Sequence, residues 1–229
     1  MKLLLAVDTS GKNGSLALAR MNSDQSEISV LEVAPLDGGA FSAQLVPRIA
    51  MLLAKHGHTK SELAGFAVAS GPGSFTGLRV GLAAIKALAE VLQQPVAVVS
   101  LLEAVARSGT AHGRMLAALD AGRGDVYVGD YELNPQMCRH SERLLSREEF
   151  LAVAKSATAN RTAVVTPEAG LADAARAVGV EVTQIESPNA AVIARLGWEH
   201  LQHGQTVRPE ELTANYLRHS DTIFTKPPR

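Results

Sequence analysis

Short apolar runs alternate with longer helix-patterned segments along the whole chain. The first run, LLLAVD at residues 3–8, predicts a buried strand, and Asn13-Gly14 is typical of a tight turn. Residues 15–20 then predict its antiparallel partner, and residues 28–34 a third strand. The rest of this half is expected to alternate helix and strand, over 42–56, 63–69, 75–92 and 95–99.

The second half repeats this order. An apolar strand at 115–120 ends in Asp120, the segment Gly122-Arg123-Gly124 turns the chain, and a strand at 125–133 returns. Helices and strands are expected to follow at 146–156, 162–166, 170–178, 180–185 and 189–203. Two copies of a hairpin-led unit predict a duplicated α/β fold with two lobes, although two hairpins can also be alike by chance. We place the lobes at 1–102 and 103–213 and a C-terminal tail at 214–229.

The segment SGPGSFTGLRVGLAAIKALAE at 70–90 carries glycines at 71, 73, 77 and 81. These spacings match neither a Walker phosphate loop nor a dinucleotide-binding fingerprint. Ser74 is a candidate helix N-cap, and Gly77 and Gly81 share one helix face. Because glycine inside a helix costs about 1 kcal/mol relative to alanine, such a pair usually marks the close approach of another backbone. The helix N-terminus could instead hold an anion, and that alternative stays open.

The helix expected at 75–92 is apolar nearly all round. Three of its four polar residues, Arg79, Lys86 and Glu90, fall within about 40° of one another. The helix at 42–56 has a similarly narrow polar stripe. Such helices must be covered on two sides, either by the second lobe or by another protein.

We favour a partner-binding surface formed by both helices and the turn between Gly73 and Thr76. Its candidate residues are Leu45, Ile49, Leu52, Gly73, Ser74, Phe75, Thr76, Gly77, Arg79, Gly81 and Ile85.

Composition narrows the possible functions. The 22 basic and 23 acidic residues leave a net charge of -1, and 4% of residues are aromatic, so the chain lacks what a self-sufficient nucleic-acid binder needs. No window reaches the roughly 18 apolar residues of a membrane span, and Asp8 comes too early for a signal peptide. The single cysteine, Cys138, fits a reducing compartment. We expect a cytoplasmic protein that does not bind membranes.

Four motifs resemble the TsaB (YeaZ) family, the bacterial accessory subunits for threonylcarbamoyladenosine synthesis in tRNA. They are VDTS at 7–10, SGPGSFTGLRVG at 70–81, D-x-x-x-G-D-V-Y at 120–127 and Tyr216-Leu217-Arg218. The resemblance covers essentially the whole chain and implies a duplicated actin-like, ribonuclease-H-like fold. Two positions depart from the family pattern, Phe41 in place of histidine and Asn215 in place of proline.

The resemblance also implies partners. A TsaB-like chain is a catalytically silent relative of the metal-bearing, nucleotide-binding subunit TsaD and binds it through a helical bundle. A P-loop ATPase, TsaE, completes the assembly, which transfers threonylcarbamoyl from its adenylate to N6 of the adenosine next to the anticodon. We therefore expect a scaffold subunit that can form a homodimer in isolation and reaches tRNA only through the complex.

No catalytic residue and no metal site are predicted in this chain. The seven histidines include no pair four apart, and His200 with His203 lacks a third ligand. Asp8, Thr9 and Ser10 resemble the first phosphate loop of actin-like ATPases, but the glycine arrives only at position 11, so the loop is degenerate and Asp8 could simply cap the hairpin. We expect ATP and metal in the partner subunits and no cofactor here.

Two other functions stay open. Asp8 and Asp120 would suit an actin-like ATPase or small-molecule kinase. A metal-dependent, glycoprotease-like peptidase is the second alternative, and the missing histidine pair argues against it.

Overall fold

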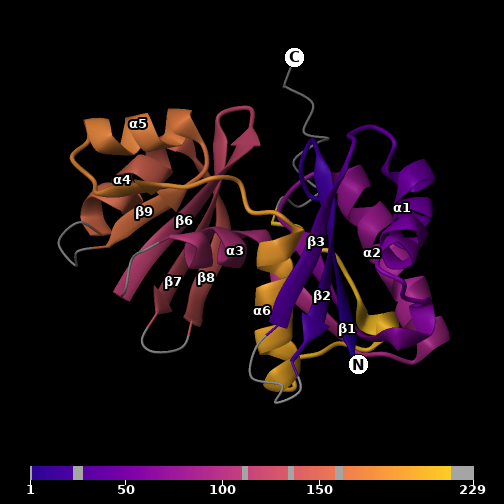
Figure 1. The fold of residues 1–229 in the computed structure, drawn as a ribbon. Helices are drawn as coiled ribbons and strands as arrows, with labels where there is room; N and C mark the ends of the chain where they lie inside the picture. The colour runs from indigo at the N-terminus through magenta and orange to yellow at the C-terminus, as the bar shows by residue number, and fades with distance from the viewer. Residues whose placement is uncertain (1, 23–27, 110–112, 134–136, 158–161, 218–229) are drawn as a thin grey trace. The chain divides into compact units, whose positions relative to one another are not determined.

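A computed structural model describes residues 2–22, 28–109, 113–133, 137–157 and 162–217 of the chain. It divides into two compact units (Figure 1), the first formed by Met1–Ala104 with Ser187–Ala214 and the second by Val105–Glu186 with Asn215–Arg229. Arg218, His112, His219 and most of the expected tail lie outside the described residues.

The first unit contains a five-stranded sheet with the strand order β3-β2-β1-β4-β5. The antiparallel part is a meander, and β4 and β5 join it in parallel to β1. The strands are β1 (Leu3–Asp8), β2 (Gly14–Met21), β3 (Ile28–Leu36), β4 (Leu63–Gly71) and β5 (Val96–Ser100).

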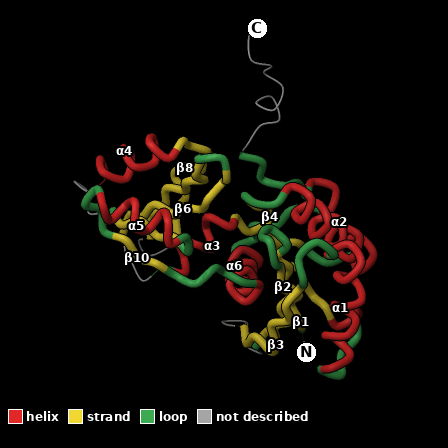
Figure 2. Tube along the Cα trace, turned by 90° about the horizontal axis from the view of Figure 1, so that it is seen from above, coloured by secondary structure: helices red, strands yellow, loops and turns green. Residues whose placement is uncertain are grey.

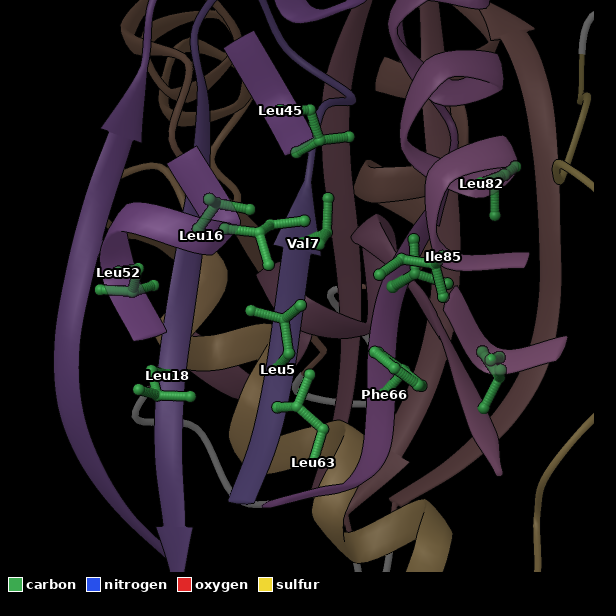
Figure 3. Close-up of a cluster of buried hydrophobic side chains, with 14 of the residues drawn as sticks. Leu5, Val7, Leu16, Leu18, Leu45, Leu52, Leu63, Phe66, Leu82 and Ile85 are labelled. Atoms are coloured by element: carbon green, nitrogen blue, oxygen red, sulfur yellow. The ribbon is translucent and has the colours of Figure 1, made fainter. Parts of the chain in front are cut away.

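Helices cover both faces of this sheet. The helices α1 (Phe41–Lys55) and α2 (Phe75–Leu92) lie on one face and α6 (Ala190–Gln202) on the other (Figure 2). The alternation of side chains along β1 explains this, because Leu5 and Val7 join the core under α1 and α2, whereas Leu4 joins the core under α6. Figure 3 shows Leu5 and Val7 among the side chains of the first of these cores.

The second unit repeats the architecture. Its sheet has the order β10-β9-β6-β7-β8, which is the order of the first sheet read from the other edge. The strands are β6 (Gly113–Gly122), β7 (Asp125–Leu133), β8 (Met137–Ser146), β9 (Ala163–Thr166) and β10 (Val182–Gln184), and its helices include α4 (Arg147–Ala157) and α5 (Ala169–Ala177). The predicted duplication is therefore present in the strand order itself.

One α-helix and one strand were not predicted from the sequence. Helix α3 (Leu101–Ser108) has eight residues, too few for a helical period to stand out. Strand β8 reads MCRHSERLLS and lies at the sheet edge, paired only with β7, so its many polar residues hide the period of a strand.

Helix α6 belongs to a different unit from the one that the sequence predicts. The sequence predicts it in the second lobe, at 103–213, but it packs on the sheet of the first unit. A Cβ on Gly197 would lie 2.2 Å from the Cβ of Ala67 in β4, so the glycine lets helix and strand approach closely. In the described ranges, no helix combines the length and apolar character needed to cross a bilayer.

Candidate functional site

The turn after β1 is closed by its own side chains. The Oδ1 atom of Asp8 accepts hydrogen bonds from the backbone N–H of Ser10 at 2.9 Å and from its hydroxyl at 2.6 Å. Asp8 is 6% exposed, and this burial raises the pKa of its carboxyl although both Ser10 bonds act in the opposite direction. Asp8 therefore caps the hairpin, as one of the two sequence interpretations had it.

Helix α2 rests directly on this turn. The hydroxyl of Thr9 donates to the carbonyl oxygen of Gly77 at 2.8 Å, and the backbone N–H of Ser74 donates to the carbonyl oxygen of Ser10 at 2.7 Å. Ser74 also caps the helix, since its hydroxyl oxygen accepts from the N–H of Gly77 at 3.2 Å.

The glycines make this contact possible. A Cβ on Gly73 would lie 2.3 Å from the carbonyl oxygen of Ser10. A Cβ on Gly77 would lie 2.1 Å from the carbonyl oxygen of Thr9, and one on Gly81 would lie 2.3 Å from its Oγ1 atom. The close approach predicted from the glycines is confirmed, but the backbone that approaches belongs to the chain itself.

This corrects part of the expected partner surface. Gly77 and Gly81 are buried against Thr9, and four apolar members of the expected surface lie in the unit's own core, namely Leu45, Ile49, Leu52 and Ile85. A helical period shows which residues share a face of the helix, but it does not show which face packs against the sheet. The remaining candidates are exposed: Gly73, Ser74, Phe75, Thr76 and Arg79.

The outer side of α1 and α2 carries exposed apolar residues that the list of candidates lacked. Val46 and Met51 on α1 are 57% and 62% exposed, and Phe75 and Val91 on α2 are 52% and 73% exposed. Smaller exposed residues lie on the same two helices: Ala43, Pro47, Ala50, Ala54, Ala83 and Ala87. We call these ten residues the outer helix face. Their apolar character at positions between the core positions was the signal available in the sequence.

The outer helix face extends over two aligned helices. Each helix follows a strand that runs parallel to β1 and leads back to the start of another such strand. The two helices therefore run parallel to each other. At their N-termini, the ring of Phe41 lies 3.3 Å from the position of a Cβ on Gly77. Near this end the guanidinium of Arg79 stacks 3.6 Å from the centre of the Phe75 ring.

His200 in α6 and His203 directly after this helix have separate partners. The Nε2 atom of His200 lies 2.9 Å from Oε1 of Glu103, and its Nδ1 lies 3.2 Å from the carbonyl oxygen of Val98. His203 instead contacts the carbonyl oxygen of Glu199 at 2.7 Å. Among the described residues, no three His, Cys, Asp or Glu side chains come together as a metal site would require.

The chain resembles known proteins in sequence and in structure. The family model described as TsaD, tRNA N6-adenosine threonylcarbamoyltransferase, matches residues 37–193. The tRNA threonylcarbamoyladenosine biosynthesis protein TsaB of Bacillus subtilis is 34% identical over 131 residues, which cover 56% of this chain and 55% of that protein. The Escherichia coli protein of the same name is 30% identical over 142 residues, covering 61% of this chain and 59% of that protein.

The alignments thus span little more than half the length of these curated relatives. The solved structure of YeaZ from Pseudomonas aeruginosa is similar over nearly the whole chain, with a TM-score of 0.77 at 28% identity, covering 95% of this chain and 100% of that one. Its likeness agrees with the duplicated actin-like, ribonuclease-H-like fold expected from the sequence. The chain therefore belongs to the TsaD family of tRNA N6-adenosine threonylcarbamoyltransferases, and within it to the TsaB (YeaZ) proteins.

Proposed function

We propose that the chain is an accessory subunit of the machinery that makes threonylcarbamoyladenosine in tRNA, and that it acts by binding a TsaD-like catalytic subunit. The observation that carries the proposal is the outer helix face. Five large apolar side chains are exposed in the described part of the chain, and four of them lie on α1 and α2. A concentration of exposed apolar side chains on two neighbouring helices is typical of an interaction site in a protein that is stable on its own.

The shape of the outer helix face indicates the kind of partner. Two parallel helices present ridges and a groove between them, and another pair of helices packs well on such a surface. Alanine dominates the small positions, so a partner's backbone can approach closely at Ala50 and Ala83. We infer that the outer helix face binds a helical surface of the partner that is apolar at its centre.

The charge chemistry supports a role without catalysis. Asp8 is buried and caps its own turn through Oδ1, so its carboxyl does not face an open phosphate-binding loop. We infer that ATP and metal are bound by the partner subunits, TsaD-like and TsaE-like, and that tRNA is reached only through the complex. In the absence of the partner, a second copy of the chain could occupy the same face, and we expect the protein to work in the cytoplasm.

Charged substitutions on the outer helix face test this proposal. Ala50→Glu and Ala83→Glu place a carboxylate at exposed positions of α1 and α2, and Ala152→Glu on α4 is the matched control on an exposed helix of the second unit. We expect the first two to weaken binding of the TsaD-like subunit encoded in the same genome by about 100-fold, because burying an unpaired charge costs several kcal/mol.

Binding would be measured by calorimetry, and threonylcarbamoyladenosine formation by mass spectrometry of tRNA from a reconstituted reaction. The melting temperature of each variant should stay within about 2 °C of the wild type, because the changed residues are exposed. Normal binding by both face variants would contradict the proposal, as would equal loss in Ala152→Glu.

Nucleotide binding by the isolated chain is tested separately. Titration of the purified protein with Mg-ATP is expected to give no saturable heat. Saturable binding that is lost in Asp8→Ala would contradict the inference and favour the actin-like ATPase or kinase.

A further inference from the structure

The contact between Thr9 and helix α2 is more specific than a helix needs in order to cover a sheet. Apolar contacts are not directional, so a helix held by them alone can roll about its axis at low cost. A hydrogen bond is directional. A close contact at a helix position that has no side chain also depends on the rotation of the helix. Both kinds of contact join Thr9 to α2.

The hydroxyl of Thr9 occupies a slot one helical turn long. It donates to the carbonyl oxygen of Gly77, and its Oγ1 atom lies where Gly81 would otherwise carry a Cβ. Thr9 is 1% exposed, so water cannot take over this bond. In a regular helix the same carbonyl also accepts from the N–H of Gly81, and a carbonyl oxygen has two lone pairs for the two donors.

This slot fits only one rotation of the helix. A shift by one residue turns the helix by about 100° and would bring Leu78 or Leu82 over Thr9 in place of a glycine. Gly73 adds a third fixed point, because its own lack of a Cβ leaves room for the carbonyl oxygen of Ser10. The turn after β1 therefore sets both the rotation and the axial position of α2.

The opposite side of α2 is the part that faces outward. At 100° per residue, Ala83 lies about 120° around the helix from Gly77 and about 160° from Gly81. Ala83 is exposed, as is Ala87. We propose that Thr9 is a positioning residue for partner binding: its hydroxyl locks the rotation of α2 and so holds Ala83 and Ala87 in line with the exposed residues of α1. This inference rests on the proposed function of the outer helix face.

Three variants separate positioning from mere stability. Thr9→Val keeps the shape and loses the hydroxyl, and Thr9→Ser keeps the hydroxyl and loses the methyl group. Ser70→Ala is the matched control, because Ser70 in β4 donates a buried bond to the carbonyl oxygen of Val99 at 3.2 Å, within the same unit but between two strands. Each would be measured by unfolding, by calorimetry with the TsaD-like subunit, and by hydrogen exchange along α2.

We expect Thr9→Val to bind the TsaD-like subunit about tenfold more weakly than Ser70→Ala does, which corresponds to about 1.4 kcal/mol. Amides from Leu78 to Ile85 should exchange at least about fivefold faster in Thr9→Val but not in Ser70→Ala, since only the first loses a bond to α2. Thr9→Ser should bind within about twofold of the wild type.

Equal effects of Thr9→Val and Ser70→Ala on affinity and exchange would overturn the inference, and so would a Thr9→Ser variant as weak as Thr9→Val. If the wild type does not bind the subunit, the proposed function fails, and the exchange data alone then decide whether Thr9 holds α2. Should Thr9→Val not fold, Thr9→Ala removes the same hydroxyl and is judged by the same criteria.

Discussion

The first hairpins of the two units have the same turn chemistry but different surroundings. In the first unit, Oδ1 of Asp8 accepts from the N–H of Ser10 at 2.9 Å, and in the second, Oδ1 of Asp120 accepts from the N–H of Gly122 at 3.0 Å. Asp8 is buried, whereas Asp120 is exposed. The hydrogen bond from a backbone N–H to the carboxylate two residues before it is thus a local feature. It forms whether the carboxylate is buried or exposed.

The difference comes from the helix that follows the fourth strand of each unit in chain order, β4 in the first unit and β9 in the second. Helix α2 has eighteen residues, and Gly77 and Gly81 bring it down onto Thr9. Helix α5 has nine residues, and nothing lies within 4 Å of a Cβ placed on its Gly170. The glycine stripe is what turns an exposed hairpin end into a buried one.

The largest expected effect contrasts these glycines. Gly77→Ala would bring its methyl group against the carbonyl oxygen of Thr9, and a backbone atom in this buried turn cannot move away cheaply. We expect a loss of about 3 kcal/mol or more in the free energy of unfolding. Gly170→Ala has free space and should change it by less than about 1 kcal/mol, in the stabilising direction. Denaturant unfolding measures both, and equal losses would contradict the comparison.

The next effect separates a side-chain obstacle from a backbone obstacle. Gly81→Ala meets the Oγ1 atom of Thr9, while the Cβ of Thr9 is 3.5 Å away. We expect a loss of about 2 kcal/mol, most of which disappears when Thr9→Ala is added. The same addition should not rescue Gly77→Ala, because its obstacle is the backbone. A double-mutant cycle on unfolding free energies decides this, and rescue of both glycine variants would show that the contacts are not distinct.

A third prediction compares ionic contacts in the two units. His200 is partly buried, and although burial disfavours its charge, the hydrogen bond and charge of Glu103 outweigh that effect and raise its pKa. Acceptors face both ring nitrogens, so only the protonated ring can donate to both.

Because the pKa of His200 is higher in the folded state, its contribution is full below the unfolded pKa of about 6.5 and is lost as pH rises through the folded value. We expect His200→Gln to cost about 1 kcal/mol more at pH 5.5 than at pH 9. His140→Gln in the exposed pair with Glu132 should cost less than about 0.5 kcal/mol. Unfolding at both pH values measures this, and a His200→Gln cost that is independent of pH would rule out the protonated ring.

The smallest expected effect returns to the two aspartates. Asp8→Asn keeps the Oδ1 acceptor but cannot ionise. Since the folded pKa of Asp8 is raised, its stabilising contribution is present below about 3.8 and is lost as pH rises through the folded value. The stability of Asp8→Asn relative to the wild type should therefore increase between pH 4 and pH 7, by up to about 1 kcal/mol. Asp120→Asn, at an exposed site, should stay within about 0.5 kcal/mol of the wild type. A relative stability of Asp8→Asn that falls over this range would contradict the assigned direction.

Much of the fold could be predicted from the chain's periodic patterns. Strand β1 begins and ends at the predicted residues, as does α2, because a fully apolar run and a long helical pattern are strong local signals. The short helix α3 and the polar edge strand β8 carry no such signal. The place of α6 could not be predicted either, since a helix far along the chain can cover whichever sheet its apolar face fits.

Part of the candidate site could likewise be predicted from the sequence, and part could not. Residue type and spacing were enough to indicate that Gly77 and Gly81 lie where another segment approaches α2 closely. They also indicated that α1 and α2 carry more apolar surface than one sheet can cover. Only the packed structure decided that the glycines face Thr9, that Leu45 and Ile85 face the core, and that Val46 and Met51 face outward. The physical reason is that a helix apolar on all sides gains nearly the same free energy whichever face it buries. Its rotation is therefore set by a few directional contacts from distant parts of the chain.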